Sequence, residues 1–156
     1  MNKFPRIYGM VVAEWVKNTT APFVTNFSVV GSLRREEPYV KDVDVLVEVK
    51  QPIGENIYKI KNAILEHATW NRGGDRMMVF DDVFGDPIQL DLFLAHPPTN
   101  FFALLALRTG PEEDSMALRR GLVEHGLQRP HATLPVNSEV EMYLLAGMEY
   151  VTPERR

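Results

Sequence analysis

The sequence contains no cysteine, which excludes a disulfide framework and any metal site built on thiolates. Long apolar stretches are missing too, because the longest uninterrupted run, residues 101–107, is far shorter than the roughly 20 residues of a membrane-spanning helix. The N-terminus shows no signal-peptide pattern. We therefore expect no membrane partner and a cytoplasmic protein, or a viral or phage protein that acts in its host cell.

Positive charge is also in short supply. The chain has 17 Lys and Arg residues against 21 Asp and Glu residues, a net charge of −4. Proteins that bind nucleic acids gain much of their affinity from cations that neutralise phosphates, so an acidic chain can do this only through local basic patches. The composition therefore keeps an enzyme with a small acceptor among the candidates.

Several motifs of common enzymes are absent. The four histidines are scattered and do not have the spacing of a zinc site. The chain has no GxxxxGK[ST] loop, no dinucleotide-binding fingerprint and no Ser/His/Asp signature. A chemistry other than that of P-loop, dinucleotide-dependent or serine enzymes is therefore expected.

Two aspartates stand out in residues 29–49, which read VVGSLRREEPYVKDVDVLVEV. Asp42 and Asp44 alternate with valines in a strand-like run, so both carboxylates project from the same face. Two like charges held side by side raise each other's pKa unless a cation lies between them, and hard divalent ions prefer such oxygen ligands. The alternative is an edge strand with one solvated face, for which alternation of Asp and Val is ordinary.

A possible phosphate site precedes this pair. Gly31 and Ser32 form a turn whose backbone N–H groups can contact an anion, and Arg34, Arg35 and Lys41 add positive charge. A phosphate-binding turn followed by a carboxylate pair is what transfer from a nucleoside triphosphate requires. We therefore favour a metal site over the edge-strand alternative.

A third carboxylate comes from residues 88–94, which read as a strand. Asp91 shares one face with Gln89 and Phe93 and is the only charge on an otherwise apolar strand. If this strand pairs beside the strand of Asp42, facing side chains lie about 5 Å apart at Cβ. Asp42, Asp44 and Asp91 could then bind two Mg²⁺ ions, for which Mn²⁺ can substitute.

These motifs resemble a known family. The segments GSLRRE, DVDVLV and QLDLF are similar to the nucleotidyltransferase signature of the X family of DNA polymerases, the polymerase beta family, and above all to its reduced viral form. The resemblance implies that Asp42 and Asp44 bridge both metal ions and that Asp91 binds the ion that activates the attacking hydroxyl. It also implies that Gly31, Ser32, Arg35 and Lys41 contact the nucleotide.

The pattern predicts an α/β (α+β) fold: a nucleotidyltransferase palm with a mixed β-sheet flanked by helices, residues 1–98, and a small thumb-like lobe, residues 99–156. In residues 5–17, Ile7, Val11 and Trp15 recur at a spacing of four and predict one buried helix face. We expect a turn at residues 18–22, a helix after residues 51–54 that residues 71–75 close, and a further strand at residues 77–80. Pro97 and Pro98 mark the boundary between the lobes.

In the second lobe, Thr109 and Gly110 resemble the turn that contacts the sugar of the incoming nucleotide, together with the preceding Leu107 and Arg108. Arg119 matches an arginine that reaches the templating side, although a solvated helix face explains it equally well. Residues 107–108 are usually aromatic or His-Phe in the family, and residues 129–133 replace an Asn-Xaa-Tyr strand motif. We therefore expect weak exclusion of ribonucleotides.

The resulting hypothesis is a monomeric, metal-dependent nucleotidyltransferase that adds nucleotides from nucleoside triphosphates to a 3′-hydroxyl of primer-template or gapped DNA. One alternative is a minimal nucleotidyltransferase that modifies RNA, a protein or a small molecule. A second alternative, outside enzymology, is a degenerate family member that only binds nucleic acid or another partner.

Overall fold

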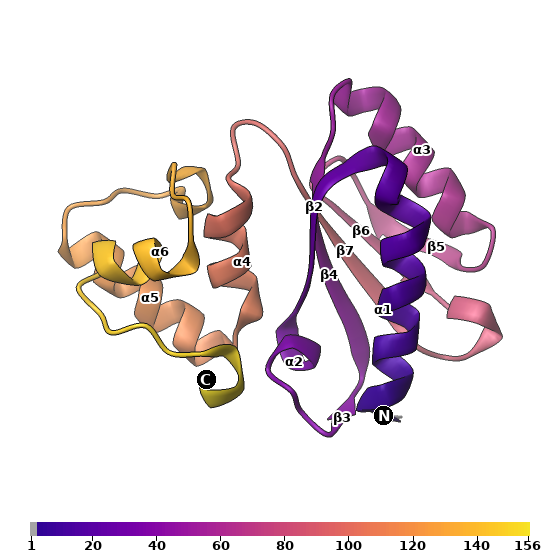
Figure 1. Ribbon diagram of the computed structural model, residues 1–156, viewed down its shortest axis with the longest axis horizontal. Helices are drawn as coiled ribbons and strands as arrows, with labels where there is room; N and C mark the ends of the chain where they lie inside the picture. The colour runs from indigo at the N-terminus through magenta and orange to yellow at the C-terminus, as the bar shows by residue number, and fades with distance from the viewer. Residues whose placement is uncertain (1–2) are drawn as a thin grey trace.

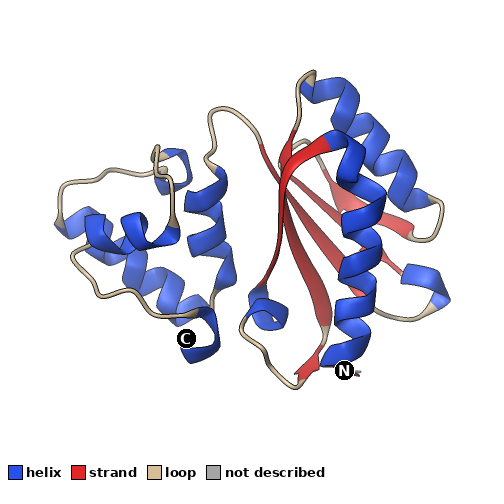
Figure 2. Cartoon of the chain, viewed as in Figure 1, coloured by secondary structure: helices blue, strands red, loops and turns tan. Residues whose placement is uncertain are grey.

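The computed structural model describes residues 3–156, and its centre is a five-stranded sheet with helices on both faces (Figures 1 and 2). The strand order is β2-β4-β7-β6-β5, with β4 and β7 parallel and the other neighbours antiparallel. The predicted α/β fold with a mixed, helix-flanked sheet is therefore confirmed. The strands are β2 Val24–Val30, β4 Asp42–Val49, β5 Thr69–Gly73, β6 Met77–Asp81 and β7 Gln89–Ala95, and a separate pair is formed by β1 Phe4–Pro5 and β3 Tyr39–Val40.

The helices divide between the sheet and the C-terminal part of the chain. They are α1 Arg6–Thr20, α2 Gly31–Arg34, α3 Ile53–Leu65, α4 Phe101–Thr109, α5 Glu112–Glu124 and α6 Glu139–Leu145. Short 3₁₀ helices cover Ala21–Phe23, Val83–Gly85, His131–Thr133 and Pro153–Arg155. Among the described residues, no helix combines the length and the apolar character that crossing a membrane requires.

One face of the sheet packs against α1 and α3. Alternation places Val43, Val45 and Val47 of β4 on this face, and the leucines of β7 join them in one large buried cluster. Burying a valine or leucine side chain stabilises a fold by about 1.5–3 kcal/mol, so this cluster is a main source of stability for the sheet and the helices that cover it.

The opposite face of the sheet is covered at one end only. There Leu46, Phe93 and Ala95 pack with Phe101 and Leu105 of α4. Asp42, Asp44 and Asp91 belong to the same face but lie further along the strands, beyond the part that α4 covers. The polar end of this face is therefore left open to a cavity.

The predicted buried face of α1 was wrong for two of its three residues. Ile7 and Val11 are 71% and 62% exposed, whereas Trp15 is partly buried against the sheet cluster, and Val12, Ala13 and Val16 are buried. Apolar residues occur on both sides of this helix, so their spacing alone could not select the face. The buried face is the one on which Gly9 lets the helix approach β3 closely, because a Cβ at Gly9 would lie only 3.0 Å from Val40.

Some element boundaries also differ from the prediction. Helix α1 continues through Thr20, where a turn was expected, and α3 already includes Gly54. The loop expected at residues 71–75 partly belongs to β5, whose Trp70 packs edge-on against Phe80 of β6. The gain from this cross-strand aromatic pair is a tertiary effect that the local sequence did not indicate.

Helices α4, α5 and α6 form a helical lobe to one side of the sheet (Figure 1). They enclose an apolar cluster of their own, separate from the two clusters on the sheet. Asn100 caps α4 by accepting a hydrogen bond from the N–H of Ala103, and Ser138 caps α6 by accepting one from the N–H of Glu141. The division into lobes at residues 98 and 99 stays a prediction.

Candidate active site

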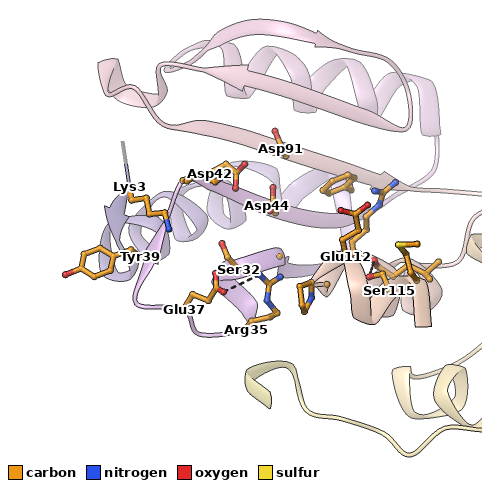
Figure 3. A pocket seen from close by; sticks show the side chains of 18 of the residues that line it. Lys3, Ser32, Arg35, Glu37, Tyr39, Asp42, Asp44, Asp91, Glu112 and Ser115 are labelled. Carbon is orange, nitrogen blue, oxygen red and sulfur yellow. Dashed lines mark hydrogen bonds and ion pairs between the residues drawn. The ribbon is translucent and has the colours of Figure 1, made fainter. Parts of the chain in front are cut away.

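The three predicted carboxylates meet because β4 and β7 are parallel and in register. Asp44 lies directly opposite Asp91, and Asp42 lies opposite Gln89. Each aspartate offers a carboxylate oxygen, and these oxygens lie within 4.8 Å of one another. The predicted pairing of these two strands is thus confirmed, and the described residues contain a group with the composition and spacing of a metal site (Figure 3).

The site is electrostatically unfavourable for its own carboxylates. Burial, together with the charges of Asp42 and Asp91, raises the pKa of Asp44 to about 8, although Arg35 opposes the shift. Burial and the charge of Asp91 raise the pKa of Asp42 in the same way, against the effect of Lys41. A divalent cation would stabilise the charged forms that the protein alone disfavours.

Gln89 is a polar neighbour of this group that the sequence analysis did not assign to the site. Its Nε2 donates a hydrogen bond of 2.7 Å to Oδ1 of Asp91. Residues 89 and 91 share a face of β7, so the contact follows from strand periodicity. The hydrogen bond fixes the orientation of the Asp91 carboxylate.

Gly31 lets the chain turn close to Asp44. It leads from β2 into the short helix α2 with a φ of +61°, a conformation that favours glycine. A Cβ at this position would overlap with Oδ2 of Asp44. Because the side chain is missing, Ser32 and the adjacent backbone approach the carboxylates across the cavity (Figure 3).

Arg35 joins the region of Ser32 to the end of α4. Its Nη1 donates a hydrogen bond of 2.7 Å to the carbonyl oxygen of Thr109, and its Nη2 lies 3.5 Å from a carboxylate oxygen of Glu37. Gly110, with a φ of +66°, passes so close that a Cβ would lie 3.0 Å from the Arg35 guanidinium. The two predicted nucleotide-binding turns are therefore in direct contact.

Arg34 lies away from the cavity, although it was predicted to add positive charge to the phosphate site together with Arg35 and Lys41. It donates hydrogen bonds of 2.6 Å to Oγ1 of Thr109 and 2.7 Å to Oε2 of Glu139, a buried residue of α6. Burial alone would raise the pKa of Glu139, but Arg34 and Arg156 lower it below its usual value. Arg34 thus connects α2, which follows strand β2 of the sheet, to helices α4 and α6.

The carboxylates, Ser32 and Arg35 line one cavity of about 800 Å³ between the sheet and α5. Thr109 has been predicted as a nucleotide contact, but it is fully buried and does not line the cavity. The other predicted residues that line it are Gly31, Lys41, Leu107, Arg108, Gly110 and Arg119. The lining residues that the sequence analysis did not find are Lys3, Glu37, Tyr39, Phe93, Pro111, Glu112, Ser115 and Met116.

The two residues before Thr109 differ in their surroundings. Leu107 is only 4% exposed and packs within the core of the helical lobe. The guanidinium of Arg108 lies 4.7 Å from the centre of the Phe93 ring, a cation–π contact at the wall of the cavity. Arg108, rather than Leu107, is therefore the more accessible of the pair.

The donor set fits a hard divalent ion. Carboxylate oxygens are the ligands of Mg²⁺ and Mn²⁺, and the described residues 3–156 contain no sulfur or imidazole ligand in this group. The repulsion among Asp42, Asp44 and Asp91 would be relieved by such an ion. The three aspartates therefore form a group that could hold a divalent cation.

A repair DNA polymerase X from African swine fever virus (isolate Tick/South Africa/Pretoriuskop Pr4/1996) is 28% identical to this chain over 142 residues. The similar region covers 84% of this chain and 81% of the viral protein. No family model matches the chain. The similarity extends over both the sheet and the helical lobe and indicates a distant relationship to a viral nucleotidyltransferase.

Proposed function

We propose that this protein transfers nucleotides from nucleoside triphosphates to the 3′-hydroxyl of DNA, as a minimal DNA polymerase of the X family that acts in gap filling or repair. The observation that carries the proposal is the in-register pairing of β4 and β7, which gathers Asp42, Asp44 and Asp91 opposite Ser32 and Arg35 in one cavity. The distant similarity to a viral repair polymerase supports the same conclusion.

In the proposed reaction, the acceptor oxygen attacks the α-phosphorus, the bond to the bridging oxygen breaks, and pyrophosphate leaves. Divalent ions held by Asp42, Asp44 and Asp91 would neutralise phosphate charge and lower the pKa of the attacking hydroxyl. Ser32 and Arg35 bind the triphosphate from the opposite wall. The contact of Arg35 with Thr109 orients its guanidinium before the nucleotide arrives.

Transfer to a smaller acceptor is the second candidate function, and one observation favours it. A second cavity, of about 410 Å³, shares Lys41 and Asp42 with the first and is also lined by Asp81 and Asp82. An acceptor that enters there passes two more carboxylates, which repel a polyanion. A neutral or cationic acceptor, such as a protein side chain, would meet no such repulsion.

A transfer assay with labelled nucleoside triphosphates and Mg²⁺ distinguishes these functions. The acceptors are gapped, recessed and single-stranded DNA, matching RNA, and a protein mixture without nucleic acid. We expect extension of gapped or recessed DNA, and its loss in Asp91→Asn, a variant that keeps the shape of the side chain but removes its charge.

Label that appears only in protein or in a small molecule would support the second function instead. If the unmodified protein releases no pyrophosphate with any acceptor in Mg²⁺ or Mn²⁺, both proposed activities are refuted. Asp91→Asn activity above a few per cent of the parent would remove Asp91 from the reaction.

A further inference from the structure

Residues 96–100 carry the chain from β7, the last strand of the sheet, to α4, the first helix of the helical lobe (Figure 1). Thr99 closes this connection into a turn. Its hydroxyl donates a hydrogen bond of 2.7 Å to the carbonyl oxygen of His96 and accepts one of 3.1 Å from the N–H of the same residue. Asn100 then caps α4. The position of the helical lobe relative to the sheet therefore depends in part on what holds this turn in place.

Arg76, in the loop between β5 and β6, holds the turn from the side of the sheet. Its own backbone is tied to the sheet, because the N–H of Leu94 of β7 donates a hydrogen bond of 2.9 Å to the carbonyl oxygen of Arg76. Its guanidinium donates hydrogen bonds of 2.7 Å and 3.2 Å to the carbonyl oxygens of His96 and Pro97. It also donates one of 3.1 Å to Oγ1 of Thr99. One planar side chain thus contacts three acceptors of the same turn.

The residue before Arg76 contacts the same turn. The carbonyl oxygen of Asp75 lies 2.7 Å from Nε2 of His96, whose side chain is buried. Within residues 3–156 no carboxylate forms an ion pair with Arg76, and the three hydrogen bonds of its side chain all go to the connection between the sheet and α4. The contact therefore joins the two parts of the molecule rather than neutralising a local charge.

The other end of α4 reaches the active-site cavity. Arg108 and Gly110 line the cavity wall, and the carbonyl oxygen of Thr109 accepts the hydrogen bond from Arg35. Helix α4 has 9 residues and is therefore only about 14 Å long. A short helix moves as one body, so a displacement of its first turn also displaces its last turn. Holding the start of α4 thus helps to place the cavity wall relative to the three aspartates.

We propose that Arg76 is a positioning residue that keeps the helical lobe, and with it the wall formed by Arg108 and Gly110, in place beside the sheet. Arg76 does not line the cavity, so it acts through α4 and not on a substrate. Its effect on triphosphate binding rests on the proposed function, because Arg35 and Gly110 meet in the proposed triphosphate site. The apparent Kd of a ligand rises as the fraction of binding-competent molecules falls, so a displaced lobe weakens binding.

The absence of cysteine allows a direct test of the position of the lobe. Asn62→Cys on α3 and Glu124→Cys on α5 change exposed residues outside the cavity, and spin labels on both report the distance between sheet and helical lobe by pulsed electron paramagnetic resonance. In this labelled protein, Arg76→Ala should broaden or shift the distance distribution. Arg72→Ala is the matched control and should leave it unchanged, because Arg72 is an exposed residue of β5 whose side chain forms no ion pair or hydrogen bond within residues 3–156.

Thr99→Val tests the contact from its other side, because it removes one acceptor and leaves the charge of Arg76 in place. It should change the distance distribution in the same direction as Arg76→Ala. The double variant should go little further than Arg76→Ala, since both residues act through one contact. A parental distribution in Arg76→Ala would overturn the proposal, and fully additive effects of the two substitutions would overturn it as well.

Ligand binding without catalysis separates positioning from general damage to the fold. Arg76→Ala should keep the parental affinity for Mn²⁺, because Asp42, Asp44 and Asp91 all lie on the sheet. Its Kd for a non-hydrolysable nucleoside triphosphate with Mg²⁺ should rise roughly fivefold, as expected when a contact of about one net hydrogen bond no longer holds the lobe.

A parallel loss of Mn²⁺ affinity would overturn the proposal, because the sheet itself would then be disturbed. If the unmodified protein binds neither Mn²⁺ nor the triphosphate, the proposed function is refuted. The distances between the spin labels need no ligand, so they still decide whether Arg76 positions the helical lobe.

Discussion

Replacing Asp44 with asparagine should stabilise the metal-free protein at neutral and alkaline pH. Asp44 lies between Asp42 and Asp91, and burial together with these two charges raises its pKa to about 8. Asparagine has nearly the same shape but no charge, so it removes the repulsion without leaving a cavity. The same substitution should abolish divalent-ion binding, since it removes a charged ligand.

The size of the effect follows from proton linkage. The folded-state pKa of Asp44, about 8, lies above its ordinary value of 3.8, so between these two pH values the native state retains a proton that the unfolded state has lost. The contribution of Asp44 to the free energy of unfolding is therefore fully present below pH 3.8. It is lost as the pH rises towards 8, by at most about 1.4 kcal/mol per pH unit. Asparagine does not titrate, so from pH 5 to pH 8 the parent should lose at most about 4 kcal/mol of unfolding free energy relative to Asp44→Asn.

Urea unfolding followed by fluorescence of Trp15 and Trp70 measures this difference at several pH values in EDTA. The variant should gain on the parent as the pH rises from 5 to 8. Adding Mg²⁺ should then stabilise the parent, most strongly at pH 8, and leave the variant nearly unchanged. Parallel pH profiles in EDTA would refute the reasoning, because Asp44 would then titrate as an ordinary exposed carboxyl.

Three further predictions concern neighbouring residues. Gln89→Leu should lower kcat by roughly ten- to a hundredfold, because Asp91 loses a hydrogen bond to its charged form; single-nucleotide insertion that keeps the parental kcat would contradict this. Arg35→Ala should weaken kcat/KM for nucleotide by about 2 kcal/mol, roughly thirtyfold, and an unchanged value would mean that Arg35 does not hold the triphosphate. The preference for deoxyribonucleotides should stay below about a thousandfold, because neither Leu107 nor Arg108 carries a ring that crowds the 2′-hydroxyl. Arg108→Tyr should raise it, and the test uses Arg108 because Leu107 is buried in the helical core.

The carboxylate group was accessible from sequence because its geometry is mostly local. Strand periodicity alone places Asp42 and Asp44 on one face and Asp91 with Gln89 on another strand's corresponding face. The missing step was the pairing of β4 with β7, which the motif resemblance suggested and the structure contains. The period of two in each strand, together with the motif resemblance, therefore sufficed to predict where this group lies.

Contacts between the sheet and the helical lobe could not be predicted from the sequence in the same way. Arg34 and Arg35 are adjacent, yet the first turns to the buried Glu139 and the second lines the cavity. Nothing in the local sequence distinguishes them, because the partner of Arg34 lies 105 residues away. Thr109 is likewise buried, and both arginines donate hydrogen bonds to it. Its own segment therefore gave no sign that it would lie behind the cavity wall.

The distribution of charge shows why net charge was an ambiguous guide to the acceptor. Part of the net charge of −4 comes from the carboxylate group of Asp42, Asp44 and Asp91, which bound cations would offset. Arg108 and Arg119, which come from α4 and α5, line the same cavity. Attraction of a strand depends on this local field, which decays over about 10 Å at moderate salt, rather than on the sum over the chain. The net charge of −4 therefore does not decide between a nucleic acid and a smaller acceptor.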